Sequence, residues 1–147
     1  MAGSTTFVHP RGLRFAATLT AVVLAVVLVT SSAILLAVQA LVFAIGAFGG
    51  LRRAPYGLLF RHTFAARLPK PAELEPEQPP RFAQLVGLLF ALVGVIGYAT
   101  GLGWLGVIAT AFAFIAAFLN AAFGLCLGCE FYLLSRRVLT IRKGVPA

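Results

Sequence analysis

The fold is decided by the stretch FAATLTAVVLAVVLVTSSAILLAVQALVFAIGAFGGL (residues 15–51), which contains no charged side chain. As a single helix it would be about 55 Å long, nearly twice the ~30 Å hydrocarbon core of a lipid bilayer. Residues 82–129 form a second uncharged stretch, which as one helix would reach about 72 Å. We therefore predict that each stretch folds back on itself and crosses a membrane twice.

The turn of each hairpin is marked by its own residues. Thr30-Ser31-Ser32 is the polar cluster of the first stretch, and TGLGW (residues 100–104) interrupts the second with two glycines and an interfacial tryptophan. The expected membrane spans are residues 14–31, 33–50, 82–99 and 105–125, each close to the minimum length for a crossing. The sequence predicts an all-α integral membrane four-helix bundle built from two hairpins.

Composition supports the membrane assignment. Hydrophobic residues make up 61% of the chain and charged residues 11%, whereas soluble domains are about a quarter charged. Residues 11–33 resemble a secretory signal peptide, with arginines before an apolar stretch and small residues after it. Because a second apolar span follows directly, we expect a retained hairpin instead of a cleaved signal.

The formal net charge of +8 reflects the placement of twelve lysines and arginines. Two precede the first hairpin, six lie between the hairpins and four follow the second, while neither turn carries any. By the positive-inside rule, both termini and the middle segment are expected in the cytoplasm, with the protein in the plasma membrane. The expected partner of these charges is anionic lipid, and nucleic acid is not implied.

The expected organisation has five parts. They are a cytoplasmic N-terminal tail (1–13), a first transmembrane hairpin (14–50), a cytoplasmic connection (51–80), a second hairpin (81–125) and a cytoplasmic CxxC segment with a basic tail (126–147). In the connection, YGLLFRHTFAARL (residues 56–68) spaces its apolar residues as an amphipathic interfacial helix does. It could serve either as a surface segment without a partner or as a docking site. PKPAELEPEQPP (residues 69–80) contains five prolines and is predicted to be an extended linker.

A weak internal repeat connects the two hairpins. RFAA (residues 14–17) and RFAQ (81–84) begin them, and AFGGL (47–51) and AFGLC (122–126) end them. Two such copies would be parallel repeats about an axis along the membrane normal. The cysteines would then occupy the position that Arg52 and Arg53 hold in the first copy.

Both cysteines of the chain lie in FGLCLGCEFYLLSRR (residues 123–137), at the expected inner end of the last span. Three interpretations of this CxxC remain open. Cys126 and Cys129 could be small packing residues at a helix end, or a redox or sulfur-handling dithiol, whose spacing lets one thiol resolve an intermediate on the other. Metal binding with His62 is the weakest interpretation, since a second ligand pair is missing.

The chemistry of the pair depends on where the helix breaks. If the last span continues through Cys129, the pair lies at a helix C-terminus, where the macrodipole and Glu130 disfavour a thiolate. If the chain breaks at Gly124 and a new interfacial helix follows, the pair lies at an N-terminus, whose free N–H groups stabilise a thiolate. Glu130 could then accept a proton. The arginines that could assist a thiolate or contact lipid are Arg52, Arg53, Arg136 and Arg137.

Few polar residues are expected inside the membrane. Gln39 and Asn120 are predicted to hydrogen-bond across helices, and Gln84 lies at the edge of a span. No Asp, Glu, Lys, Arg or His falls within the stretches 15–51 and 82–129. Their absence argues against a proton-coupled transporter and against acid–base hydrolysis inside the bilayer.

The blocks PPRFAQLVGLLF (79–90) and FLNAAFGLCLGCEFYLLSRR (118–137), together with PRGLRFAA and RRAPYGLLFR, resemble a known family. The chain is similar, over nearly all of residues 10–137, to the small actinobacterial membrane proteins grouped as domain of unknown function 4395. The resemblance implies a four-span inner-membrane protein of a high-GC Gram-positive bacterium, without an established activity. It also favours a thioredoxin-like or sulfurtransferase-like protein as partner.

We therefore expect a membrane protein that uses Cys126 and Cys129, with Glu130, in thiol redox or sulfur transfer. The alternative is a non-catalytic accessory or scaffold subunit of a larger membrane complex, or of a homo-oligomer, in which the cysteines only pack. A redox pair should have neighbouring sulfurs that are open to solvent, whereas packing cysteines should be buried and apart. The sequence does not indicate a cofactor.

Overall fold

The computed structural model describes residues 7–8, 10–50, 55–60, 75–76 and 78–142. In chain order the elements are β1 (Phe7–Val8), α1 (Pro10–Thr30), α2 (Ala33–Ala44), the π-helical turn η1 (Ile45–Gly49), α3 (Pro55–Phe60), β2 (Glu75–Pro76), α4 (Gln78–Ala99), α5 (Gly103–Phe123) and α6 (Leu127–Arg142). The predicted all-helical fold is confirmed, and the two-residue strands form a single short antiparallel ladder beside it.

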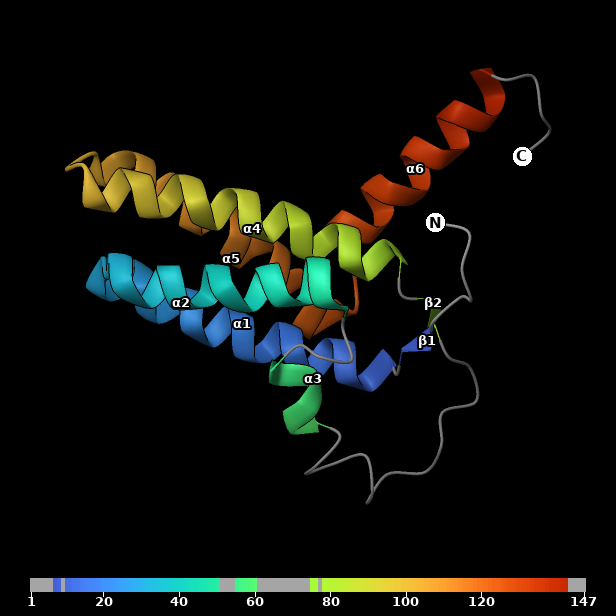
Figure 1. The fold of residues 1–147 in the computed structure, drawn as a ribbon, viewed down its shortest axis with the longest axis horizontal. Coiled ribbons are helices and arrows are strands. Elements are labelled where there is room, and N and C mark those ends of the chain that lie inside the picture. The colour runs from blue at the N-terminus through green and yellow to red at the C-terminus, as the bar shows by residue number, and fades with distance from the viewer. Residues whose placement is uncertain (1–6, 9, 51–54, 61–74, 77, 143–147) are drawn as a thin grey trace.

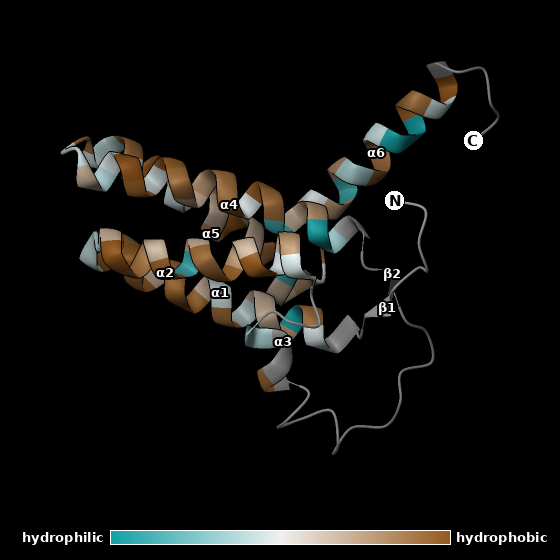
Figure 2. Cartoon of the chain, viewed as in Figure 1, coloured by the Kyte–Doolittle hydropathy of each residue, from teal (hydrophilic) through white to brown (hydrophobic). Residues whose placement is uncertain are grey.

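Helices α1, α2, α4 and α5 form an antiparallel bundle (Figure 1). Helix α1 packs chiefly against α5 and α2 against α4, so each hairpin contacts the other along its length. Among the described residues, three segments are long and apolar enough to cross a membrane, Gly12–Thr30, Pro80–Ala99 and Gly103–Phe123, and Ala33–Gly49 is a shorter apolar helix. Hydrophobic colours dominate these four helices in Figure 2, while hydrophilic colours gather on α6 and at the end of the bundle next to α6.

Both predicted hairpin turns lie at the end of the bundle away from α6 (Figure 1). In the first turn Ser31 adopts a left-handed backbone with φ 54°, and Ser32 caps α2 by accepting a 3.1 Å hydrogen bond from Leu35 N. In the second turn Gly101 supplies the left-handed residue, with φ 86°. Polar residues and glycine thus end each helix at the places that the sequence indicates.

Small residues allow the bundle helices to approach closely. A Cβ added at Gly97 of α4 would lie 2.5 Å from the backbone nitrogen of Gly106 in α5. A Cβ added at Gly87 of α4 would lie 2.8 Å from the ring of Phe43 in α2. Fully buried aliphatic residues such as Leu24 fill the centre. Small residues that let backbones approach closely favour van der Waals packing between helices in lipid.

Two arginines join the hairpins at the end of the bundle away from the turns. Arg14, at the start of the first hairpin, donates to the carbonyls of Ala121 and Ala122 at the end of the second. Arg81, at the start of the second hairpin, donates to the carbonyls of Ala47 and Phe48 at the end of the first. The repeated segments RFA and AFG are therefore hydrogen-bonded to each other, each RFA to the AFG of the other half.

The connection between the hairpins is described in part. Helix α3 packs against α1, and the predicted interfacial helix over 56–68 is described only as far as Phe60. The predicted linker over 69–80 is wrong at its end, because α4 already begins at Gln78. Prolines at positions 79 and 80 fit the first turn of a helix, where backbone N–H groups have no partner to lose.

Candidate functional site

The cysteines lie at the beginning of a separate helix. Gly124 ends α5 with a left-handed backbone of φ 70°, and α6 begins three residues later. Cys126 is the residue before α6, and its carbonyl accepts a 3.0 Å hydrogen bond from Glu130 N. Of the two arrangements left open by the sequence, the chain adopts the break at Gly124 that places the pair at a helix N-terminus.

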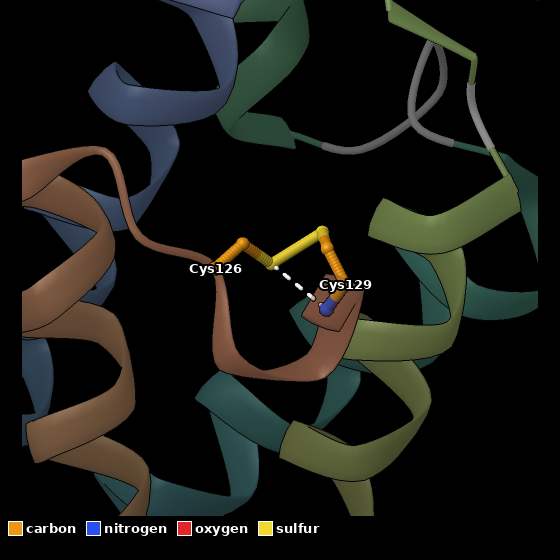
Figure 3. The surroundings of a disulfide bond; sticks show 2 residues. All are labelled: Cys126 and Cys129. Carbon is orange, nitrogen blue, oxygen red and sulfur yellow. Dashed lines mark hydrogen bonds between the residues drawn. A yellow bond between two sulfur atoms is a disulfide. The ribbon is translucent and has the colours of Figure 1, made fainter. Parts of the chain in front are cut away.

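The two sulfur atoms are bonded to each other (Figure 3). Their Cα atoms are 5.2 Å apart, and Cys129 N–H donates a 3.3 Å hydrogen bond to Cys126 Sγ. The Cys126 sulfur thus occupies the position in which serine or aspartate oxygens usually accept a first-turn N–H group. Both side chains are partly exposed, so the pair can be reached from outside the bundle.

The end of α5 next to the cysteines is held by two kinds of contact. The glycine turn satisfies the carbonyls of Leu119 and Asn120, through Leu125 N at 3.3 Å and Gly124 N at 3.0 Å. Arg14 Nη2 reaches the next two carbonyls, at 3.1 Å for Ala121 and 3.3 Å for Ala122. Arg14 comes from α1, more than a hundred residues earlier in the chain.

The first turns of α6 are pressed against α4. Gly128, between the cysteines, lies so close that an added Cβ would be 2.5 Å from both Cα and Cβ of Ala83. One turn later the rings of Phe82 and Tyr132 pack with their centroids 5.7 Å apart. The cysteine turn is therefore fixed between two elements, with the end of α5 on one side and the start of α4 on the other.

The other predicted site residues have varied surroundings. Glu130 is exposed in the first turn of α6. Arg136 donates to the Tyr132 hydroxyl at 3.3 Å and lies over its ring, 5.9 Å from the centroid. Arg137 is exposed. The two remaining arginines of the prediction, at positions 52 and 53, lie outside the described residues.

The metal interpretation receives no support from the part of the chain that the structure describes. Within these residues no three His, Cys, Asp or Glu side chains gather in one place. His62, the third ligand in that interpretation, lies outside them.

The predicted intramembrane polar residues are all within the described helices. Gln39 is 1% exposed, and its Oε1 accepts a 2.7 Å hydrogen bond from the Tyr56 hydroxyl of α3. Its Nε2 has no partner among the described residues. The side chain of Gln84 lies against Gly46 of η1, and Asn120 contributes its backbone carbonyl to the end of α5. The partner of Gln39 is thus in the connection and not in another bundle helix.

Two residues at the site were missed by the sequence interpretation. Arg14 was counted among the basic residues before the first hairpin and as the start of RFAA, and the recurrence of RFA at Arg81 could have indicated a shared structural role. Gly128 was given no role in packing from the sequence, whereas in the structure it permits the contact with α4.

A family model described as "Domain of unknown function (DUF4395)" matches residues 8–137. No curated protein and no solved structure matches the chain. The matched region includes the four bundle helices, the cysteine pair and most of α6. The chain therefore belongs to the family of domain of unknown function 4395.

Proposed function

We propose that this protein is a membrane-embedded dithiol–disulfide exchange protein whose reactive pair is Cys126 and Cys129. The observation that carries the proposal is the geometry at the start of α6, where the two sulfurs are joined in a partly exposed turn. The first-turn N–H of Cys129 points at Cys126 Sγ. Free N–H groups at a helix N-terminus stabilise a thiolate, which is the reactive form of cysteine.

The exchange proceeds in two balanced steps. The Cys126 thiolate attacks one sulfur of a partner disulfide, forming a mixed disulfide and releasing the partner's other sulfur as a thiolate. The Cys129 thiolate then attacks Cys126 Sγ, closing the Cys126–Cys129 disulfide and releasing the partner's second thiolate. Two electrons pass from the pair to the partner, and the two protons of the original thiols pass to solvent or to a base. The reverse sequence lets a partner dithiol reduce the pair.

The assignment of Cys126 as attacking thiol follows from its surroundings. Its sulfur accepts the backbone N–H that would stabilise a negative charge, whereas Cys129 is the donor of that N–H and is placed to resolve the mixed disulfide. Glu130 follows directly and is exposed, so it can accept the proton of Cys129 before the second step.

The proposed partner is a thioredoxin-like protein, which would exchange a disulfide with the pair, or a sulfurtransferase-like protein, which would transfer a persulfide sulfur to it. The Cys126 thiolate would take the outer sulfur of a partner persulfide, leaving the partner as a thiolate and Cys126 as a persulfide. Attack by Cys129 on Cys126 Sγ would then release hydrosulfide and close the disulfide.

The proposed topology has four crossings, with the cysteine end of the bundle in the cytoplasm. Ala33–Gly49 is shorter than the other three spans and is about 25 Å long at the α-helical rise, slightly less than the ~30 Å core. The bilayer can thin locally around a short span at modest cost. Basic residues at this end and their absence from both turns support the orientation.

The decisive experiment is a redox titration of the pair. Full-length protein in lipid nanodiscs is equilibrated in dithiol–disulfide buffers, and free thiols are counted with a maleimide mass tag. We expect reversible two-electron titration with a midpoint between about −120 and −270 mV, the range of known oxidoreductases of this spacing. Cys126→Ser and Cys129→Ser should each abolish it. Thiols that react only after unfolding would contradict exchange and favour the scaffold alternative.

A further inference from the structure

Cys126 lies between two helix ends of opposite polarity. The carbonyl end of α5 stops at Phe123 and the N–H end of α6 begins at Leu127. A helix C-terminus carries partial negative charge and an N-terminus partial positive charge. The end of α6 therefore stabilises a thiolate on Cys126, and the end of α5 would oppose it unless its carbonyls were neutralised.

Arg14 supplies that neutralisation. The glycine turn leaves the carbonyls of Ala121 and Ala122 without a backbone donor, and the Arg14 guanidinium donates to both of them. The cation is thus bonded to two carbonyls in the last turn of α5, four and five residues before Cys126. A charge-assisted hydrogen bond of this kind also fixes the direction in which the chain leaves the helix.

We propose that Arg14 is a positioning residue for the cysteine pair, one that cancels the negative end of α5 and so lets the N–H end of α6 stabilise the Cys126 thiolate. This role rests on the proposed exchange function. Arg14 does not contact the partner disulfide, and it acts through the carbonyls that it holds.

Of the other charged side chains that the structure describes, none is hydrogen-bonded to the end of α5. On α4, Arg81 is bonded to the end of η1. On α6, Glu130 opposes a thiolate, Arg136 is bonded to Tyr132 and Arg137 is exposed. Helix α5 carries no charged residue. Within the described part of the chain, Arg14 is therefore the cation attached to the helix end that precedes the pair.

The chain contains a matched control in Arg81. It makes the same type of bond to Ala47 and Phe48, at a helix end that carries no cysteine. It also precedes Phe82 and Ala83, the α4 residues on which α6 packs. Loss of packing transmitted to the cysteines would therefore be seen in Arg81→Gln as well.

The test measures the pH–rate profile of Cys126 alkylation by iodoacetamide in full-length protein in nanodiscs. Cys129→Ser makes Cys126 the single thiol while it retains the backbone N–H that meets the sulfur. In this background, Arg14→Gln should move the midpoint of the profile to higher pH by about 0.5 unit, so that alkylation at pH 7 slows about threefold. Arg14→Lys, which keeps the charge, should leave the midpoint unchanged, and so should Arg81→Gln.

Thermal unfolding of the same variants separates this role from a structural one. Both glutamine variants remove comparable bonds, so both should unfold at lower temperature, and only Arg14→Gln should move the profile. An unchanged profile in Arg14→Gln, or equal shifts in both variants, overturns the inference and leaves the exchange function intact. A Cys126 thiol that iodoacetamide does not reach at any pH overturns both.

If Arg14→Gln does not fold, Arg14→Lys still tests the inference. Arg14→Lys loses the two-carbonyl fork and should lower the unfolding temperature while it preserves the profile. A shift of its midpoint to higher pH by half a unit or more would contradict the electrostatic role of the charge.

Discussion

Gly128 separates the two cysteines and lies at the closest contact between α6 and α4. An alanine there would place its Cβ 2.5 Å from Cα and Cβ of Ala83, and backbone atoms cannot move aside as a flexible side chain can. We expect Gly128→Ala to lower the free energy of unfolding by about 1–3 kcal/mol, the usual cost of overpacking. It should also move the reduction midpoint of the pair, because the turn that holds the sulfurs is displaced.

Two variants test this contact from both sides. A Cβ at Gly103, in the first turn of α5, would meet no atom within 4 Å, so Gly103→Ala should leave unfolding and the midpoint unchanged. Ala83→Gly should restore only part of the stability in the Gly128→Ala background, because it removes the Cβ contact while the Cα of residue 83 stays 2.5 Å from the added Cβ. A Gly128→Ala protein that behaves like wild type in denaturant unfolding and redox titration would show that α6 does not rest on α4 there.

The hydrogen bond between half-buried Tyr56 and buried Gln39 predicts a second effect of single side chains. Tyr56→Phe leaves the Gln39 side chain without its one described hydrogen bond in an apolar interior. We expect a loss of about 1–3 kcal/mol in unfolding free energy. Gln39→Leu combined with Tyr56→Phe should recover most of that loss, because the unpaired amide of residue 39 is then removed from the interior. A double-mutant cycle with additive effects would contradict the coupling.

Tyr56 should also give the protein a pH dependence at the alkaline end. Burial raises the pKa of Tyr56 above its ordinary value of 10.0. The folded protein therefore keeps the phenolic proton at pH values where the unfolded chain releases it, so stability decreases as pH rises above about 10. Unfolding followed from pH 8 to 11 should show this decrease in wild type and a smaller one in Tyr56→Phe. Identical slopes would contradict it.

At the scale of elements, the left-handed turn at Gly124 decides whether α5 and α6 are one helix or two. Alanine adopts this backbone at a cost of about 1–2 kcal/mol per residue, and no atom obstructs a Cβ there. Gly124→Ala should therefore favour a continuous helix and slow Cys126 alkylation at pH 7, since the sulfur loses its place at an N-terminus. Gly101→Ala, with φ 86° and equally open space, should lose similar stability without changing alkylation.

The bundle helices and their turns could be predicted because their signals are local. Uncharged stretches set the lengths, and Ser31 and Gly101 lie within the predicted turns. The start of α4 was misjudged, since prolines that forbid a helix interior are compatible with its first turn. The π-helical turn over Ile45–Gly49 leaves no local signal, and neither does the choice of backbone at Gly124.

The site was predictable in its residues and only partly in its geometry. The spacing of Cys126 and Cys129 identified the pair, but whether it lies at a helix start or a helix end depends on one glycine dihedral. Arg14 and the Ala83 contact of Gly128 join segments that are far apart in sequence. Such contacts follow from how the hairpins dock, which no short pattern encodes.

At the scale of the whole molecule, the two halves make matching contacts. Each hairpin begins with an arginine bonded to the end of the other. Each is followed by a helix that packs on the first helix of its own hairpin, α3 on α1 and α6 on α4. Tyr56 of α3 donates a hydrogen bond to Gln39, whereas Tyr132 of α6 packs on the ring of Phe82. In the first half a hydrogen bond thus joins α3 to α2, whereas the second half carries the cysteines.

This arrangement requires both turns on one side of the membrane and α6 on the other. In a Cys126→Ser, Cys129→Ser background, single cysteines at Ser31, Thr100 and Ser135 can be probed with a membrane-impermeant maleimide on intact cells. Because basic residues gather at the α6 end, we expect labelling of Ser31→Cys and Thr100→Cys from outside, and of Ser135→Cys only after lysis. The opposite pattern would reverse the orientation. Labelling of Thr100→Cys alone would mean that the short span Ala33–Gly49 does not cross, which would separate the arginines from the helix ends that they hold.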